Sequence, residues 1–197
     1  MSTSILQVLK QETSLLHKTA EEKNLAKYII ENSITLEQYI ALIKQNYTLY
    51  KTLEDQLICN KELLPEPYQK FVSNKKSEAL KKDLSNLNVF WEDTKSLAIS
   101  FSDSFASVIG IMYVIEGSML GGQVIKHHIQ KCQSLQGIPE QFFFGDDSKA
   151  VRLRWNQFCD TLLKSSFTES EVRQSVLSAK KTFEYFIRVF SETEKKV

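Results

Sequence analysis

The sequence contains few of the residues that interrupt helices or build disulfide frameworks. Its 197 residues include only three prolines, six glycines and three cysteines. The cysteines, Cys59, Cys132 and Cys159, are odd in number and widely spaced, and no Cys-x-x-Cys pair is present. This pattern excludes a disulfide scaffold and is typical of a protein from a reducing cytoplasm.

Charge and hydropathy exclude several classes of partner. The 25 Lys and Arg residues nearly balance the 24 Asp and Glu residues, so no net field favours nucleic acid or a charged membrane surface. No apolar run comes near the roughly 18 residues of a membrane span. The first residues lack the charged start and apolar core of a signal peptide. We therefore expect a cytoplasmic protein that binds neither nucleic acid nor membrane.

Helical periodicity dominates the chain, and no convincing alternating strand is present. Thr35 and Thr168 each begin a capping box, and Asp103 is expected to cap the longest helix. The expected helices cover about residues 4–22, 25–31, 35–58, shorter pieces within 66–86, then 103–132, 147–165 and a final helix from 168. Without a linker or repeat, the chain is predicted to be one all-α domain over residues 1–197.

Half of the glycines lie close together inside the longest predicted helix, at Gly117, Gly121 and Gly122. Each glycine in a helix interior costs about 1 kcal/mol relative to alanine. That cost is large beside a domain stability of about 5–15 kcal/mol. Two interpretations remain open: a flat or bulky ligand approaches the backbone here, or a second helix crosses closely.

The first predicted helix carries a possible metal-binding group. Lys10, His17 and Glu21 follow a Lys-x6-His-x3-Glu pattern, which places all three on one helix face. Lys10 lies two turns before His17, about 10 Å away along the axis. The imidazole of His17 is suited to ligate a metal, Glu21 to accept a hydrogen bond from its other nitrogen, and Lys10 to hold an anionic group. A surface histidine among solvated charges would show the same pattern.

Tyr113 lies one turn before Gly117 and therefore shares its face. Its hydroxyl is placed to reach a polar edge of a ligand over the glycines. A half-buried tyrosine with a hydrated hydroxyl is the alternative.

These two motifs together resemble the heme oxygenases, especially the bacterial type. The Lys10-x6-His17-x3-Glu21 pattern is similar to their proximal helix. The segment Tyr113-Val114-Ile115-Glu116-Gly117-Ser118-Met119-Leu120-Gly121-Gly122-Gln123-Val124 is similar to their distal helix. The separation of about 100 residues and the chain length also match the family.

The resemblance implies an all-helical fold with heme b held between the first helix and a kinked distal helix. It implies oxidative cleavage of heme to biliverdin, carbon monoxide and ferrous iron, with dioxygen and external electrons. His17 would be the axial iron ligand, and Lys10 and Tyr113 would contact the propionates. Gly117, Ser118, Gly121 and Gly122 would form the distal face.

Two features of the resemblance are less direct. The mammalian type has Asp after the first distal glycine, whereas this chain has Ser118 at that position. Several bacterial members also lack the Asp. The route of proton delivery is therefore open. Arg154 is suggested as a further propionate contact. Because no flavin or ferredoxin module is recognisable, a separate ferredoxin or reductase is expected to supply electrons.

The same residues bear on several other functions. A thiaminase-like hydrolase needs a cysteine nucleophile, and no cysteine lies in a recognisable motif. A di-iron oxidase needs several Glu-x-x-His elements, which His127 and His128, adjacent on one helix, do not supply. His128 and Cys132 form an i, i+4 pair that offers zinc only two ligands. A non-enzymatic heme carrier or sensor shares the proposed pocket and is the main alternative.

Overall fold

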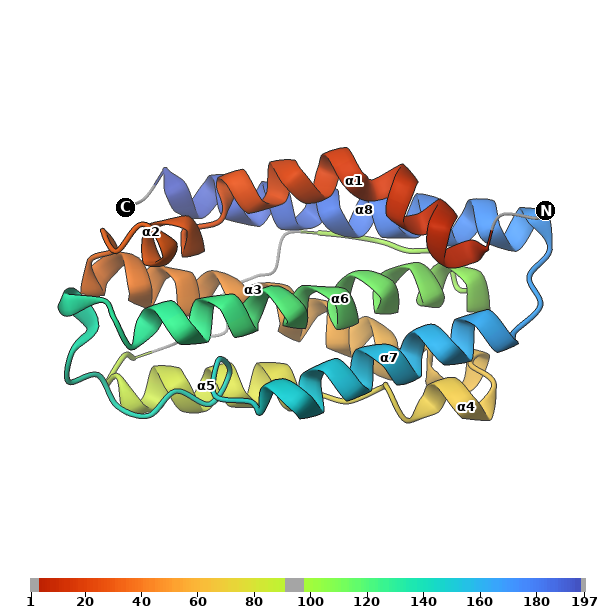
Figure 1. Ribbon diagram of the computed structural model, residues 1–197. Coiled ribbons are helices and arrows are strands. Elements are labelled where there is room, and N and C mark those ends of the chain that lie inside the picture. Colours follow the sequence, from red (N-terminus) through yellow and green to blue (C-terminus); the bar gives the residue numbers. More distant parts are fainter. Residues whose placement is uncertain (1–3, 91–97, 196–197) are drawn as a thin grey trace.

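The computed structural model describes residues 4–90 and 98–195, and within these ranges every regular element is helical. Figure 1 shows long helices packed roughly side by side. The elements are α1 (Ile5–Lys23), α2 (Ala26–Ile30), α3 (Leu36–Cys59), η1 (Lys61–Leu63), α4 (Glu66–Gln69), α5 (Lys75–Asn86), α6 (Phe105–Ile129), η2 (Gln133–Leu135), α7 (Ser148–Lys164) and α8 (Glu169–Glu194). The predicted all-α class is therefore confirmed.

Helix starts follow local capping chemistry. Thr35 and Thr168 form the predicted capping boxes with Gln38 and Glu171. The predicted cap of the helix that carries the glycine cluster was wrong by one residue: Ser104 caps α6, since its hydroxyl accepts the amide of Ser107 at 3.2 Å.

The same helix also ends earlier than expected. It ends at Ile129 rather than at about Cys132, and the short 3-10 helix η2 follows.

The C-terminal helix α8 organises the fold. Both α1 and α6 pack along α8, whereas α1 and α6 touch each other only slightly. Helix α3 packs on α5 and α8, and α7 packs on α6 and α1 (Figure 1). The proximal and distal helices suggested by the sequence are therefore held apart by a common support rather than pressed together.

Gly110 is the glycine that permits close helix crossing. A Cβ atom at Gly110 would lie 2.2 Å from the carbonyl oxygen of Ser175 and 2.8 Å from the amide nitrogen of Ala179, both on α8. Both are backbone atoms, so α6 and α8 would have to separate to admit a methyl group.

We expect Gly110→Ala to lower the free energy of unfolding by about 1–3 kcal/mol, because overpacking outweighs the gain in helix propensity. Chemical denaturation of the heme-free protein measures the change. An unchanged or higher denaturation midpoint would contradict the crossing geometry.

Among the described residues one helix, α6, is long and apolar enough by length and composition to cross a membrane, with a mean hydropathy of 1.5. The expectation that no such segment exists was therefore wrong. However, 56% of that window is buried inside the protein, as in the core helix of a globular fold. The apolar composition of α6 is accounted for by its packing against α8 and its neighbours.

Candidate functional site

The functional face of α1 is defined by Thr13, which is buried, and by His17, whose side chain is 55% exposed. Nδ1 of His17 lies 3.8 Å from Oε2 of Glu21, which suits a water-bridged contact and is too long for a direct hydrogen bond. Lys10 is exposed and lies on the same face, one turn before Thr13. The predicted alignment of the cation, imidazole and carboxylate on one helix face is thus present.

Tyr113 joins this face of α1 to α6. Burial raises the pKa of the Tyr113 phenol, and the nearby side chain of Thr13 acts in the opposite direction. The Tyr113 ring also lies 5.8 Å from the ring of Trp155 on α7, centroid to centroid. Tyr113 therefore sits where α1, α6 and α7 meet, and it orients one face of α6 towards the helix that carries His17.

That face of α6 continues as an apolar strip with an open surface. At 100° per residue, positions 117, 120, 121 and 124 fall within about 100° of Tyr113. Leu120 is 36% exposed and Val124 is 50% exposed, although both are large apolar side chains. An exposed apolar strip beside an accessible imidazole is typical of a ligand-binding face.

The three glycines of this segment, of which Gly117 and Gly121 lie on the strip, do not mediate a close helix crossing. A Cβ at Gly121 would meet no atom of the described residues within 4 Å. At Gly122 the nearest atom would be Cδ1 of Phe144 at 3.8 Å, and at Gly117 it would be the Trp155 ring at 3.4 Å. The ligand interpretation is therefore favoured over the crossing interpretation, which belongs to Gly110.

Aromatic rings form the floor between α1 and α6. The His17 ring meets Phe183 of α8 edge-on, with centroids 5.5 Å apart. Phe183 lies 6.2 Å from Phe186, and Phe186 lies 6.3 Å from Tyr50 of α3. Since Tyr50 contacts Ser118, a continuous row of rings connects the predicted iron ligand to the predicted distal residue.

Ser118 is held by two hydrogen bonds. Its hydroxyl donates to the carbonyl of Ile115 at 2.8 Å, and its oxygen lies 2.9 Å from the hydroxyl of Tyr50. Because the Ser118 proton is directed at Ile115, Tyr50 is the donor in the second bond. Burial raises the pKa of Tyr50, so this phenol keeps its proton at neutral pH.

A buried ion cluster lies behind the glycine segment. Glu116, only 3% exposed, accepts from Lys76 Nζ at 3.2 Å and from Arg154 Nε at 2.6 Å. Arg154 also donates through Nη2 to Glu116 at 3.0 Å and to the Phe71 carbonyl at 2.9 Å. Arg154 therefore anchors Glu116 and with it α6, and its contact with a propionate stays a prediction.

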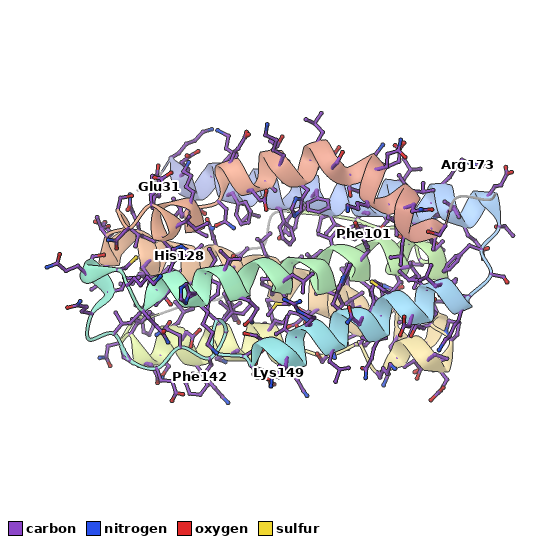
Figure 2. All side chains as sticks on the ribbon, viewed as in Figure 1. Glu31, Phe101, His128, Phe142, Lys149 and Arg173 are labelled. Atoms are coloured by element: carbon purple, nitrogen blue, oxygen red, sulfur yellow. The ribbon has the colours of Figure 1, made fainter. Side chains whose placement is uncertain are left out.

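The remaining candidate ligands are not gathered into a metal site. His128 Nδ1 lies 2.9 Å from the Val124 carbonyl. Cys132 is buried, and its thiol donates to the Ile29 carbonyl at 3.4 Å. Within residues 4–90 and 98–195, no three His, Cys, Asp or Glu side chains form a group suited to a metal ion. Figure 2 shows His128 near the end of α6. The zinc alternative therefore has no structural support.

Sequence reasoning missed several residues of the site. Thr13 was detectable, because it shares the helix face of Lys10 and His17. Tyr50 and Trp155 come from other helices, and no local pattern connects them to the glycines.

The chain matches a known family and known proteins over most of its length. A family model described as heme oxygenase matches residues 3–192. The chain is 26% identical to a heme oxygenase of Guillardia theta, covering 98% of this chain and 88% of that protein. It is 24% identical to Heme oxygenase 1 of Gallus gallus, covering 100% of this chain and 72% of that protein.

Two solved structures share the fold. The heme oxygenase of Neisseria meningitidis, determined with bound NO and CO, matches with a TM-score of 0.71 and 20% identity, over 98% of this chain and 92% of that one. The heme oxygenase of Leptospira interrogans matches with a TM-score of 0.71 and 19% identity, over 96% of this chain and 100% of that one.

Proposed function

Because the chain belongs to the heme oxygenase family, whose activity is the oxidative degradation of heme to biliverdin, we propose that heme b binds between α1 and α6 with His17 as its axial ligand. The observation that carries this assignment is the row of rings that runs from His17 through Phe183, Phe186 and Tyr50 to Ser118. It connects the face of α1 that bears His17 with the segment of α6 that bears Gly117 and Ser118. The heme itself supplies the iron and the conjugated ring on which the oxidation takes place.

The residues on both faces fit a heme. The His17 side chain is 55% exposed, and its ring meets Phe183 edge-on. The carboxylate of Glu21 near Nδ1 favours the tautomer in which Nε2 carries the lone pair. The apolar side chains Leu120 and Val124 and the bare backbone at Gly121 offer a flat surface to the opposite face of the ring.

Ser118 and Tyr50 are the polar groups placed to handle protons beside the glycines. Tyr50 donates to Ser118, so rotation of the Ser118 hydroxyl away from Ile115 would direct a proton towards the distal side. We propose that this pair, with water, takes the place of the distal Asp of mammalian members. The neutral phenol of Tyr50 keeps that donor available at neutral pH.

Lys10 and Tyr113 are proposed to contact the heme propionates from the two walls. A charge-assisted hydrogen bond contributes about 1.5–3 kcal/mol, so Lys10→Ala should weaken heme affinity about tenfold or more. Tyr113→Phe should have a smaller effect on affinity. The double variant should also rotate the heme and change the ratio of biliverdin isomers.

Heme titration and chromatography of the products measure both effects. Lys18→Ala is the matched control, because Lys18 is an exposed lysine of α1 paired with Glu22. If the double variant keeps wild-type affinity and isomer ratio, neither residue contacts a propionate.

The decisive test of function is turnover of the heme complex. The protein is loaded with heme and supplied with dioxygen and electrons from ferredoxin and its reductase, and biliverdin is identified by absorbance and mass. We propose a separate electron-donor protein of this kind as the physiological partner and the cytoplasm as the location. A complex that binds heme through His17 but yields no biliverdin would instead indicate a heme carrier or sensor.

A further inference from the structure

A buried carboxylate on α5, remote in sequence from both motifs, supports the distal side of the site. Asp83 has no exposed surface. Its Oδ1 accepts the backbone amide of Phe142 at 2.7 Å, and its Oδ2 accepts the amide of Phe143 at 3.0 Å. Both amides belong to the connection between α6 and α7, so one side chain of α5 holds this connection at two adjacent points. Figure 2 places Phe142 at the edge of the molecule beside α5.

The two phenylalanines that follow Phe142 carry this constraint into the site. Phe143 and Phe144 are each 5% exposed, and their ring centroids lie 4.9 Å apart. The Phe143 ring lies 5.0 Å from the Tyr50 ring. The Phe144 ring lies against Gly122, since a Cβ there would be 3.8 Å from its Cδ1.

The chemistry of Asp83 suits a latch with two acceptors. Burial raises the pKa of its carboxyl to about 6, whereas the two amide hydrogen bonds act in the opposite direction. The group is therefore ionised at neutral pH and offers both oxygens. An asparagine of the same shape would offer one oxygen and would set an N–H against the second amide. The same connection is tied to α3 by a hydrogen bond from Tyr39 to Gln141.

We propose that Asp83 is a positioning residue for the distal wall. By holding the amides of Phe142 and Phe143, it sets the Phe143 ring against Tyr50 and the Phe144 ring against the glycine segment. Tyr50 in turn orients the hydroxyl of Ser118, 2.9 Å away. This inference rests on the proposed function of Ser118 and Tyr50, and it adds α5 and the α6–α7 connection to the machinery that shapes oxygen chemistry.

The test compares Asp83→Asn with the wild type at pH 8, where the wild-type carboxyl is ionised. In the heme-free protein, hydrogen exchange at the Phe142 and Phe143 amides should be roughly tenfold faster, as expected for the loss of one hydrogen bond. Exchange over residues 118–122 should also accelerate. The affinity for heme should stay within about twofold of that of the wild type, because the substitution does not touch α1. The spectrum of the histidine-ligated heme should be unchanged.

The distal readouts should change in the same variant. The pH midpoint between the acid and alkaline spectra of the ferric complex should shift by roughly half a unit, since the polar environment on that side changes. The products should contain a wider mixture of biliverdin isomers. A role confined to general stability would move neither readout.

Two further variants separate positioning from stability. Ser77→Ala removes a hydroxyl of α5 that donates to Glu54 at 2.6 Å, so it weakens the same helix without touching the latch. It should leave the spectral midpoint and the isomer ratio unchanged. Phe143→Leu keeps the two latched amides and removes the ring beside Tyr50, so it should reproduce the distal changes of Asp83→Asn while the amides stay protected. If Asp83→Asn does not fold, Phe143→Leu still tests the contact between the Phe143 ring and Tyr50.

The outcomes are distinct. The proposal would be overturned if Asp83→Asn kept both wild-type hydrogen exchange over residues 118–122 and the wild-type pH midpoint of the ferric spectra. It would also be overturned if Ser77→Ala produced the same changes as Asp83→Asn. If the wild-type protein itself forms no biliverdin, the proposed function fails, and the exchange and spectral measurements still decide the role of Asp83.

Discussion

Replacement of His17 by alanine is expected to abolish heme turnover and to remove the spectrum of a histidine-ligated heme. The reason is geometric: His17 is an accessible imidazole of α1, and its ring meets Phe183 edge-on and lies 3.8 Å from the Glu21 carboxylate. Alanine leaves the apolar walls intact, so heme should still enter the site, with weaker affinity and without a protein nitrogen on the iron. Added imidazole should restore the ligated spectrum and part of the activity, because it can occupy the space of the lost side chain.

His127→Ala and His128→Ala are the matched controls. Both histidines belong to the last turn of α6, and their rings contact each other at 5.7 Å. Their variants should keep wild-type spectra and turnover. If His17→Ala retains the ligated spectrum, or if one of the control variants loses it, His17 is not the iron ligand.

A methyl group at Gly121 should impair the chemistry while leaving the fold intact. A Cβ at this position would meet no atom of the described residues within 4 Å, so Gly121→Ala introduces no clash with them. The change should raise helix stability by up to about 1 kcal/mol. The same methyl would occupy the surface that faces the heme, where dioxygen must react and where water must reach Ser118. We expect heme to bind and biliverdin formation to fall about tenfold or more, with electrons diverted to hydrogen peroxide.

Denaturation, heme titration, biliverdin yield and peroxide release together test this prediction. Gln123→Ala is a suitable control, because Gln123 lies on the same turn and its side chain accepts from Ser148 of α7. It should leave biliverdin yield unchanged. A full yield from Gly121→Ala would mean that the missing side chain has no role in oxygen chemistry, and the assigned function of the glycine strip would have to be withdrawn.

The sequence by itself determined the features that depend on local periodicity and capping. These include the all-α class, the capping boxes at Thr35 and Thr168, and the face shared by Lys10 and His17. It also located the glycine segment, because glycine inside a helix carries a cost that needs a cause. Such features arise from interactions within about one helical turn, which the order of residues specifies directly.

Tertiary structure alone decided which faces meet. Gly110, rather than the glycine cluster, proved to be the site of close helix crossing, because α8 happens to pass it. The contacts of Tyr50 with Ser118 and of Arg154 with Glu116 join residues 68 and 38 positions apart in the chain. No periodic pattern encodes such pairs, since they depend on how whole helices pack against α8. The proximal and distal motifs are therefore evident in the sequence, whereas the support that sets their separation exists only in the folded protein.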